Sequence, residues 1–297
     1  MGRGPAIVFH RAKGHLKVPS RGWVSHRGFD YCFAPVPLVG FVRSPRVGVF
    51  RVDFSRKRID WQPAGDCSPR LLWAIVTGRV LGLLLPWLRP SLVLHASVLK
   101  IRGEAVAILG PSTGGKSTLA AALLNHGASL LCDDIAVVEG RGRDLFVLPG
   151  LPEIRLWPEA WRRFRPEGVR AQALYPGARK RRLSLRPRSR WDFTEEPMPL
   201  RAAYLLSRKK RGGLRIEDLG GREALLGMVQ NAYNGVSSTP RILRQEFEIA
   251  ARLIQKVPVK RLVYPTGFSH LPGVCRAILE DLPGPLWPAE RLLGRSG

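Results

Sequence analysis

The chain has 297 residues, and 45% of them are hydrophobic, so it can bury one large core or two modest ones and is not expected to be disordered. Its formal net charge of +25 is extreme, with 38 Arg against 10 Lys, yet residues 91–140 are close to neutral. The four cysteines lie far apart and form no C-x-x-C pair, so neither a zinc site nor a disulfide framework is indicated, and a reducing, cytoplasmic location is favoured.

The positive charge would attract polyanions such as ATP, an acidic partner, nucleic acid or anionic lipid. The alternative is a preference for arginine on solvated faces, which needs no partner. No RNA-binding or DNA-binding signature accompanies the charge, so nucleic acid is not the expected partner.

Residues 1–90 are predicted to form a basic, β-rich region that ends in an apolar helix. Short β-like runs at 36–42 and 47–54 are separated by Pro, Gly and Arg. The start of the chain lacks the continuous apolar segment of a secretory signal, so export is not expected.

The apolar helix is predicted over residues 71–88 and raises the question of a membrane. Arg79 interrupts its centre, Pro86 breaks it near its end, and its length is at the lower limit for a spanning helix. We therefore expect a helix that docks within the protein, and no transmembrane segment.

Two strands, at 91–101 and 104–109, are predicted to precede a glycine-rich segment, 110–118, that satisfies G-x-x-x-x-G-K-[ST]. A helix at 118–126 follows, and Gly127 stands where a helix commonly ends in a left-handed residue. Strand, loop and helix in this order predict a P-loop that binds the phosphates of ATP. The residues expected to cradle the phosphates are Gly110, Pro111, Ser112, Thr113, Gly114, Gly115, Lys116, Ser117 and Thr118.

The chemistry of this loop depends on its backbone. Small residues let successive N–H groups turn inward around an anion, and the following helix presents its positive end. Lys116 would reach the outer phosphates, and Ser117 would hold Mg²⁺. The alternative, a glycine-rich turn that only closes a β-α unit, leaves Lys116 without a purpose.

An acidic pair follows the P-loop helix. A buried strand is predicted at 128–132, and Asp133 and Asp134 stand at its end, where an open α/β sheet would bring them back beside the phosphates. Adjacent carboxylates on an extended chain point in opposite directions, so one can face a metal while the other faces a phosphate acceptor. The alternative role for such a pair is a turn or a helix cap.

The rest of the chain is predicted to begin with a hairpin around 140–142. The Arg-rich stretch at 162–190 is predicted to be exposed loop with short strands, and from it Lys180 or Arg182 could reach a transferred phosphate or an acidic substrate segment. The alternative for these basic residues is a solvated loop. A strand at 201–207, helices at 223–230 and 242–255, and a strand and a helix within 261–282 complete the predicted elements.

His95 lies in a strand-like run, where a histidine is more often a hydrogen-bonded core residue than a catalyst. Its context changes this interpretation, because His95-Ala-Ser, Gly110-Pro-Ser-Thr-Gly-Gly-Lys-Ser117, Gly127 and Leu131-Cys-Asp-Asp134 follow one another at the spacing of a known family. This arrangement resembles the catalytic domain of the HPr kinase/phosphorylase family, most of all its HPr-kinase-related proteins. The resemblance covers residues 95–155.

The resemblance implies an α/β fold with a phosphoenolpyruvate-carboxykinase-like nucleotide core, over residues 91–297. It also implies that Lys116 contacts the β- and γ-phosphates. Either Asp133 or Asp134 would be the base that deprotonates an acceptor serine, with His95 assisting it, and the sequence does not decide between them. The expected Mg²⁺ ligands are Ser117, Asp134 and Glu153.

Two departures from the family pattern qualify these expectations. Thr113 holds a loop position where the family has Gly, so the positive-φ residue of the loop is expected to shift. The long N-terminal domain of the bifunctional enzymes is not recognisable in residues 1–90, which argues against HPr as the substrate.

The expected function is Mg-ATP-dependent transfer of the γ-phosphoryl group to a hydroxyl, namely a Ser of a protein or peptide partner. Three alternatives stay open: a small-molecule kinase, for example of free serine; an ATP-binding regulatory protein without catalysis; and a basic nucleic-acid or membrane-surface protein that uses ATP as a regulator. Members of the family assemble into rings, so a homo-oligomer is compatible with the resemblance.

Overall fold

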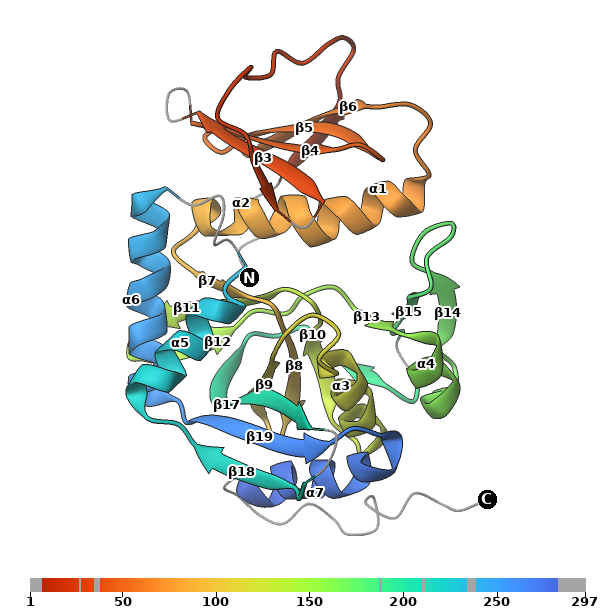
Figure 1. The fold of residues 1–297 in the computed structure, drawn as a ribbon, viewed down its shortest axis with the longest axis vertical. Coiled ribbons are helices and arrows are strands. Elements are labelled where there is room, and N and C mark those ends of the chain that lie inside the picture. The colour runs from red at the N-terminus through yellow and green to blue at the C-terminus, as the bar shows by residue number, and fades with distance from the viewer. Residues whose placement is uncertain are drawn as a thin grey trace.

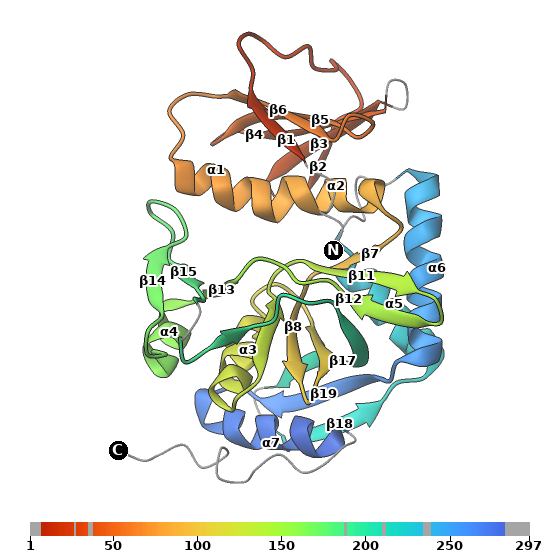
Figure 2. The same ribbon diagram turned by 180° about the vertical axis from the view of Figure 1, so that it is seen from behind.

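The computed structural model describes residues 7–26, 28–34, 38–186, 189–209, 212–233 and 239–282. The protein is mixed α/β, and the described residues form three sheets (Figures 1 and 2). One sheet lies at the top of Figure 1, a long helix crosses beneath it, and the largest sheet with its covering helices lies below.

The first sheet is built from the N-terminal part of the chain. Its order is β1-β6-β5-β4-β3-β2, with β1 parallel to β6 and the other pairs antiparallel. The strands are β1 (Val8–Arg11), β2 (Val24–His26), β3 (Phe29–Ala34), β4 (Val39–Ser44), β5 (Gly48–Asp53) and β6 (Arg58–Pro63). Strands β4 and β5 correspond to the predicted runs at 36–42 and 47–54, of which 36 and 37 lie outside the described residues. The other four strands were not predicted from the sequence.

The helix beneath this sheet runs continuously over Pro69–Leu88. It consists of α1 (Pro69–Ile75), a π-helical turn η1 (Val76–Val80) and α2 (Leu81–Leu88), and the Ser68 hydroxyl caps its start by accepting the Leu71 N–H at 3.2 Å. It is long and apolar enough to cross a membrane, but half of that apolar window is buried in the protein. Leu71, Val80, Leu83 and Leu84 pack against the first sheet, which accounts for the apolar composition.

The largest sheet has the order β16-β10-β8-β9-β17-β12-β11-β7, and β19 pairs with both β17 and β18. Its strands are β7 (Leu92–Leu94), β8 (Ala96–Ile101), β9 (Glu104–Leu109), β10 (Ser129–Cys132), β11 (Ala136–Arg141), β12 (Asp144–Val147), β16 (Asp192–Phe193), β17 (Met198–Lys209), β18 (Arg215–Asp218) and β19 (Val259–Pro265). The predicted hairpin around 140–142 is the antiparallel pair β11–β12.

Helices cover both faces of this sheet, because the side chains of β8 and β9 alternate between two apolar cores. Leu99 and Ile108 face the core that contains α3 (Lys116–Asn125) and α7 (Leu271–Asp281), which is preceded by the short helix η2 (Phe268–His270). Val98 and Ala107 face the core that contains α5 (Gly221–Asn231) and α6 (Pro240–Lys256).

A third, small sheet stands beside α3, at the right of Figure 1, and its order is β13-β15-β14. It consists of β13 (Glu153–Leu156), β14 (Arg170–Ala173) and β15 (Arg181–Ser184), and α4 (Pro158–Phe164) packs nearby. The prediction of mostly exposed loop for 162–190 is wrong for its apolar residues, since Leu183 and Leu185 are buried in the α3 core. Residues 187 and 188 lie outside the described residues.

Three strands of the largest sheet bring the predicted site residues to one edge. Strand β8 is antiparallel to both of its neighbours, with Ala96 opposite Leu109 of β9 and Val98 opposite Cys132 of β10. The end of β9, the start of β8 and the end of β10 therefore lie together. The acidic pair after β10 lies beside the loop that follows β9, as expected, but the two strands are separated by β8, which is antiparallel to both.

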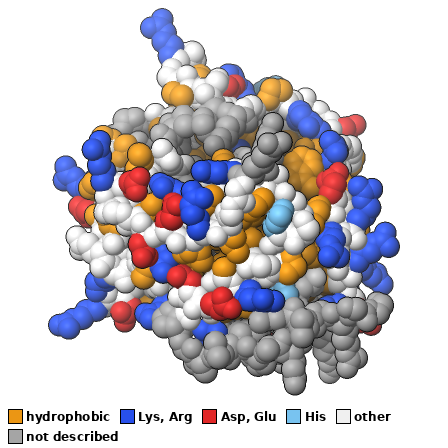
Figure 3. Space-filling model, turned by 60° about the horizontal axis from the view of Figure 1, so that its bottom comes forward, with side chains coloured by type: hydrophobic (Ala, Val, Ile, Leu, Met, Phe, Trp, Pro, Cys, Tyr) orange, Lys and Arg blue, Asp and Glu red, His pale blue; other side chains and the backbone are white. Residues whose placement is uncertain are grey.

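The charge of the protein is spread over its surface on the face shown in Figure 3. There, Lys and Arg side chains are interspersed with Asp and Glu and do not form one continuous patch. On this face the basic side chains therefore lie among acidic and hydrophobic ones.

Candidate active site

The glycine-rich loop joins the end of β9 to the start of α3. Three of its residues have positive φ: Gly110 at 150°, Thr113 at 64° and Gly115 at 100°. The expected shift of the left-handed position is therefore wrong, because Thr113 adopts it in place of a glycine and Gly114 does not. The φ of 100° at Gly115 is one that other residues rarely adopt, and a Cβ atom there would also come within 3.2 Å of the Arg208 guanidinium.

Lys116 is the buried cation of this loop. It is 6% exposed, and its Nζ donates to the carbonyl oxygens of Gly110 at 2.8 Å and Pro111 at 3.0 Å. The ammonium group is thus held over the loop whose backbone the sequence predicts to bind phosphate. Helix α3 begins at Lys116, so the first-turn N–H groups and the positive end of the helix lie at the same place.

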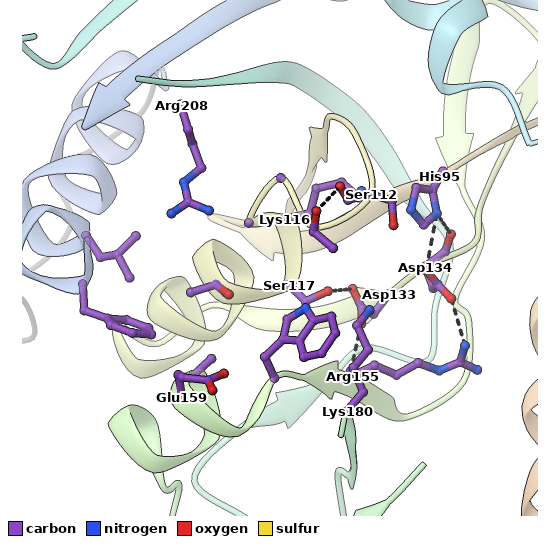
Figure 4. Close-up of a pocket in the computed structure, with 18 of the residues that line it drawn as sticks. His95, Ser112, Lys116, Ser117, Asp133, Asp134, Arg155, Glu159, Lys180 and Arg208 are labelled. Atoms are coloured by element: carbon purple, nitrogen blue, oxygen red, sulfur yellow. Dashed lines mark hydrogen bonds and ion pairs between the residues drawn. The ribbon is translucent and has the colours of Figure 1, made fainter. Parts of the chain in front are cut away.

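A cavity of about 240 Å³, which we call the loop cavity, opens in front of these residues. Residues 112–118 form one wall, and Trp157, Tyr264 and Phe268 supply aromatic surface. In Figure 4, Arg208 stands at one end, His95 and Asp134 stand at the other, and Lys116 and Ser117 lie between. The combination of cations, backbone and aromatic surface matches the phosphates and base of a nucleotide.

The structure separates the two carboxylates of the acidic pair. Asp133 Oδ1 accepts hydrogen bonds from the hydroxyls of Ser117 at 2.9 Å and Ser97 at 2.6 Å. Its Oδ2 accepts one from the backbone N–H of Arg155 at 2.9 Å. Asp134 turns away through a left-handed backbone, with φ at 75°, and its Oδ2 lies 2.8 Å from Arg155 Nη1. Asp133 therefore contacts Ser117 of the loop, whereas Asp134 contacts the side chains of His95 and Arg155.

His95 and Asp134 form a dyad. Nδ1 of His95 lies 3.0 Å from the Asp134 carbonyl oxygen and 3.3 Å from its Oδ1, which favours the tautomer with the proton on Nδ1. His95 sits at the break between β7 and β8, and its N–H donates to the Asn231 carbonyl at 2.8 Å. The predicted partnership of His95 with a carboxylate is thus formed with Asp134.

Both groups of the dyad have shifted pKa values. Burial lowers the pKa of His95 below 6.5 against the attraction of Asp134, so the imidazole is neutral at pH 7. Burial alone would raise the pKa of Asp134, but Arg155 and then His95 outweigh it and hold the pKa below 3.8. The resting dyad is therefore a neutral imidazole beside a carboxylate.

The remaining predicted residues divide into those that reach the cavity and those that do not. Lys180 lines the loop cavity, with its Nζ 5.7 Å from the centre of the Trp157 ring. Glu153 and Arg182 are not among the residues that line it, and they face each other at 3.8 Å. Glu153 also lies 3.3 Å from Arg155, so it supports that arginine.

Several residues of the site were not predicted from the sequence, and they include Arg155, Arg208, Asn231 and Tyr233. The Asn231 side chain accepts the Gly110 N–H at 3.0 Å and donates to the Gly227 carbonyl at 2.9 Å, which fixes the start of the loop to α5. Arg155 lies two residues after Glu153, at the end of the segment that resembles the family, so the sequence could have indicated it as a site residue. No spacing in the sequence connects Arg208, Asn231 or Tyr233 with the loop.

The residues around Ser117 fit a magnesium ion. A hydroxyl and a carboxylate lie side by side, and Mg²⁺ takes oxygen ligands, usually one or two from the protein and the rest from phosphates and water. Over the described residues, no group of three His, Cys, Asp or Glu has the arrangement of a metal cage. One hydroxyl and one carboxylate could hold Mg²⁺ together with phosphate and water ligands.

A second cavity of about 500 Å³, which we call the helix cavity, lies on the other side of the dyad. Its walls come from the turn η1, from Phe29 of the first sheet, from Tyr175 and from residues 229–233 at the end of α5. Five residues line both cavities: His95, Ser112, Asp134, Arg155 and Lys180. The dyad therefore stands where two compartments meet.

The fold and the site thus define a mixed α/β protein with a glycine-rich loop between a strand and a helix, and with an adjoining acid–histidine dyad. No family model and no curated protein sequence matches the chain. Among solved structures, the Hpr(Ser) kinase/phosphatase from Coxiella burnetii is similar at 15% sequence identity, covering 61% of this chain and 91% of that chain, with a TM-score of 0.31. This likeness is weak, and the function proposed below rests on the geometry of the site alone.

Proposed function

We propose that the protein transfers the γ-phosphoryl group of Mg-ATP to a hydroxyl acceptor. The observation that carries this proposal is that the His95–Asp134 dyad and Lys180 line both cavities. A phosphate donor in the loop cavity and an acceptor in the helix cavity would meet at these residues. Reactions of this type depend on positioning and on charge stabilisation, and two adjoining compartments provide the positioning.

On the donor side, the backbone of residues 110–118 binds the phosphates and Lys116 neutralises their charge. Ser117 and Asp133 hold Mg²⁺, which when bound neutralises the β- and γ-phosphates. We assign Asp133 to the metal in place of Asp134, because Asp133 is the carboxylate beside Ser117. Arg208, at the far end of the loop cavity, is placed to stabilise charge on the phosphates.

On the acceptor side, the dyad takes the proton of the attacking hydroxyl. The hydroxyl oxygen forms a bond to the γ-phosphorus, the bond from that phosphorus to the β–γ bridging oxygen breaks, and ADP leaves with the electron pair. Arg155 keeps Asp134 ionised and in place through its 2.8 Å contact. Lys180, between the cavities, is placed to accompany the phosphoryl group during transfer.

The finer assignments from the sequence remain proposals. They are the HPr-kinase-like identity, the phosphoenolpyruvate-carboxykinase-like core, the cytoplasmic location, and a Ser of a protein or peptide as acceptor. A small hydroxyl compound is the second candidate acceptor, and the helix cavity favours it because the acceptor side of the dyad is a walled compartment.

The test is transfer of label from γ-³²P-ATP to a panel of serine peptides and small hydroxyl compounds, followed by mass spectrometry of the products. Wild-type protein should label at least one acceptor or hydrolyse ATP slowly, and Asp134→Asn should bind ATP with similar affinity but lose transfer. Mg-ATP binding with no transfer to any acceptor or to water would instead support the ATP-binding regulatory role. Absence of ATP binding in both proteins would overturn the donor site.

A further inference from the structure

Arg79 is a charged residue that the proposed transfer does not use. It interrupts the apolar helix at the π-helical turn η1, where it is half-buried and lines the helix cavity. Its guanidinium carbon lies 5.3 Å from the centre of the Phe29 ring and 5.8 Å from that of Tyr233. The guanidinium therefore lies within cation–π distance of two rings, and such a group can bind a planar anion through its N–H groups.

No carboxylate of the described residues lies within ion-pair distance of Arg79. The cavity also carries surplus positive charge: Arg79, Arg155 and Lys180 line it, and Asp134 is the only described carboxylate among its lining residues. Asp134 already pairs with Arg155. An anion entering this cavity would therefore gain a partner in Arg79 without displacing an existing one.

Tyr233 connects Arg79 with the dyad. Its ring lies 6.4 Å from the His95 ring and 5.8 Å from the Arg79 guanidinium carbon, and its hydroxyl donates to the Gly78 carbonyl. A second contact holds the turn, because the Thr77 hydroxyl accepts a hydrogen bond from the Arg155 side chain at 3.2 Å. Arg79 is thus at a fixed position, one aromatic ring away from the group that would deprotonate the acceptor.

We propose that Arg79 binds the carboxylate of the phosphate acceptor, and that the acceptor is a small hydroxyl compound carrying a carboxylate. This inference rests on the proposed function, because it places the acceptor hydroxyl at the His95–Asp134 dyad. It also gives the π-helical turn a role, since such turns in helices are frequent at functional sites.

The experiment compares matched acceptors that differ in the carboxylate. D-glycerate is paired with glycerol, and L-serine is paired with L-serinamide, each with Mg-ATP and the full-length protein. We expect kcat/KM for at least one carboxylate to exceed that of its neutral partner by about 10- to 100-fold, the range for a hydrogen-bonded charge. Equal kcat/KM within both pairs, or a preference for a serine peptide with blocked ends, would overturn the proposal.

Two variants locate the effect. Arg79→Gln should remove most of the preference for the carboxylate while leaving transfer to the neutral partner and the affinity for Mg-ATP within about twofold of wild type. The matched control is Arg222→Gln, which changes the net charge equally but alters an exposed residue on α5. An unchanged preference in Arg79→Gln would remove the assignment.

A binding measurement separates this proposal from the proposed function. Titration calorimetry of D-glycerate and L-serine into wild type and Arg79→Gln requires no turnover. Carboxylate binding in wild type that is lost in Arg79→Gln, without transfer to any acceptor, would keep the anion site and refute the kinase function. Transfer to neutral compounds with no carboxylate binding would keep the function and refute the anion site.

Discussion

Arg155 donates a hydrogen bond to the hydroxyl of Thr77 over 3.2 Å, and the same guanidinium holds Asp134 at 2.8 Å. Thr77 belongs to the helix beneath the first sheet, whereas Arg155 belongs to the small sheet beside α3. The N-terminal part of the chain therefore contacts the acidic pair through one arginine.

Replacing Thr77 by Val keeps the shape of the side chain but removes the oxygen that accepts from Arg155 Nη2 and donates to the Trp73 carbonyl at 2.8 Å. The loss of one hydrogen bond to a charged group costs about 1.5–3 kcal/mol when its partner is left unsatisfied, and Glu153 at 3.3 Å would recover part of this. We expect phosphoryl transfer to fall by about fivefold to tenfold with unchanged Mg-ATP affinity, measured by steady-state kinetics and calorimetry. A parallel loss of ATP affinity would show that Arg155 acts on the donor side instead.

The sequence predicted the parts of the site that are local in the chain. The glycine-rich loop with its lysine and serine, and the acidic pair, all lie within 25 residues of sequence. The apolar runs and glycines of this segment predict the two strands and the helix that carry them. His95 joins them because β8 is the antiparallel neighbour of β9 and β10.

The rest of the site depends on packing between distant segments. Asn231 reaches Gly110 across 121 residues, and Tyr233 reaches Gly78 across 155. Neither residue belongs to a pattern that differs from an ordinary helix end. The helix at 71–88 was predicted, but its role as the wall of a cavity follows only from where the first sheet places it.

Single substitutions of Asp133 and Asp134 should have different effects, one on Mg²⁺ binding and the other on phosphoryl transfer. Asp133→Asn removes the carboxylate beside Ser117, so Mg²⁺ binding should weaken and the Mg²⁺ concentration for half-maximal ATP binding should rise by about 10-fold or more. Asp134→Asn should leave that concentration within about twofold of wild type and abolish transfer. Calorimetry at stepped Mg²⁺ concentrations checks the first effect. A rise in the required Mg²⁺ concentration in Asp134→Asn, and not in Asp133→Asn, would instead identify Asp134 as the metal ligand.

Thr113 occupies a left-handed conformation, with φ at 64°, that is costly for a β-branched residue. Thr113→Gly should relieve this strain, and the gain is offset in part by the larger freedom of glycine in the unfolded chain. We expect a net stabilisation of about 0.5–1 kcal/mol, measured by urea unfolding. Thr113→Ala is the control, because alanine keeps the Cβ atom that makes the conformation costly, and an equal gain in both variants would contradict the explanation.

Glu139 joins Arg89 at the end of the long helix to β11, at 2.9 Å, and also contacts Arg141 at 2.7 Å. Burial alone would raise its pKa, but hydrogen bonds from Arg141 and Arg89 outweigh burial and hold the pKa below 4.5. Glu139 is then protonated at a higher pH in the unfolded chain than in the folded protein. Its contribution to the free energy of unfolding is therefore present above pH 4.5 and is lost as pH falls through the lower folded pKa. Thermal unfolding between pH 6 and 3.5 should depend less on pH in Glu139→Gln than in wild type, whereas the exposed control Glu196→Gln should follow wild type.

Gly82 of α2 lies against Tyr233, and a Cβ atom there would lie within 2.6 Å of Tyr233 Cδ1. Gly82→Ala should therefore displace the tyrosine ring from its contacts with Arg79 and His95, despite the higher helix propensity of alanine, and destabilise the protein by about 1–3 kcal/mol. Transfer to the acceptor should fall with Mg-ATP affinity unchanged, as measured by kinetics, calorimetry and urea unfolding. Gly221→Ala at the start of α5, where nothing lies within 4 Å, is the matched control. Wild-type kinetics in Gly82→Ala would show that the position of Tyr233 does not matter for the acceptor.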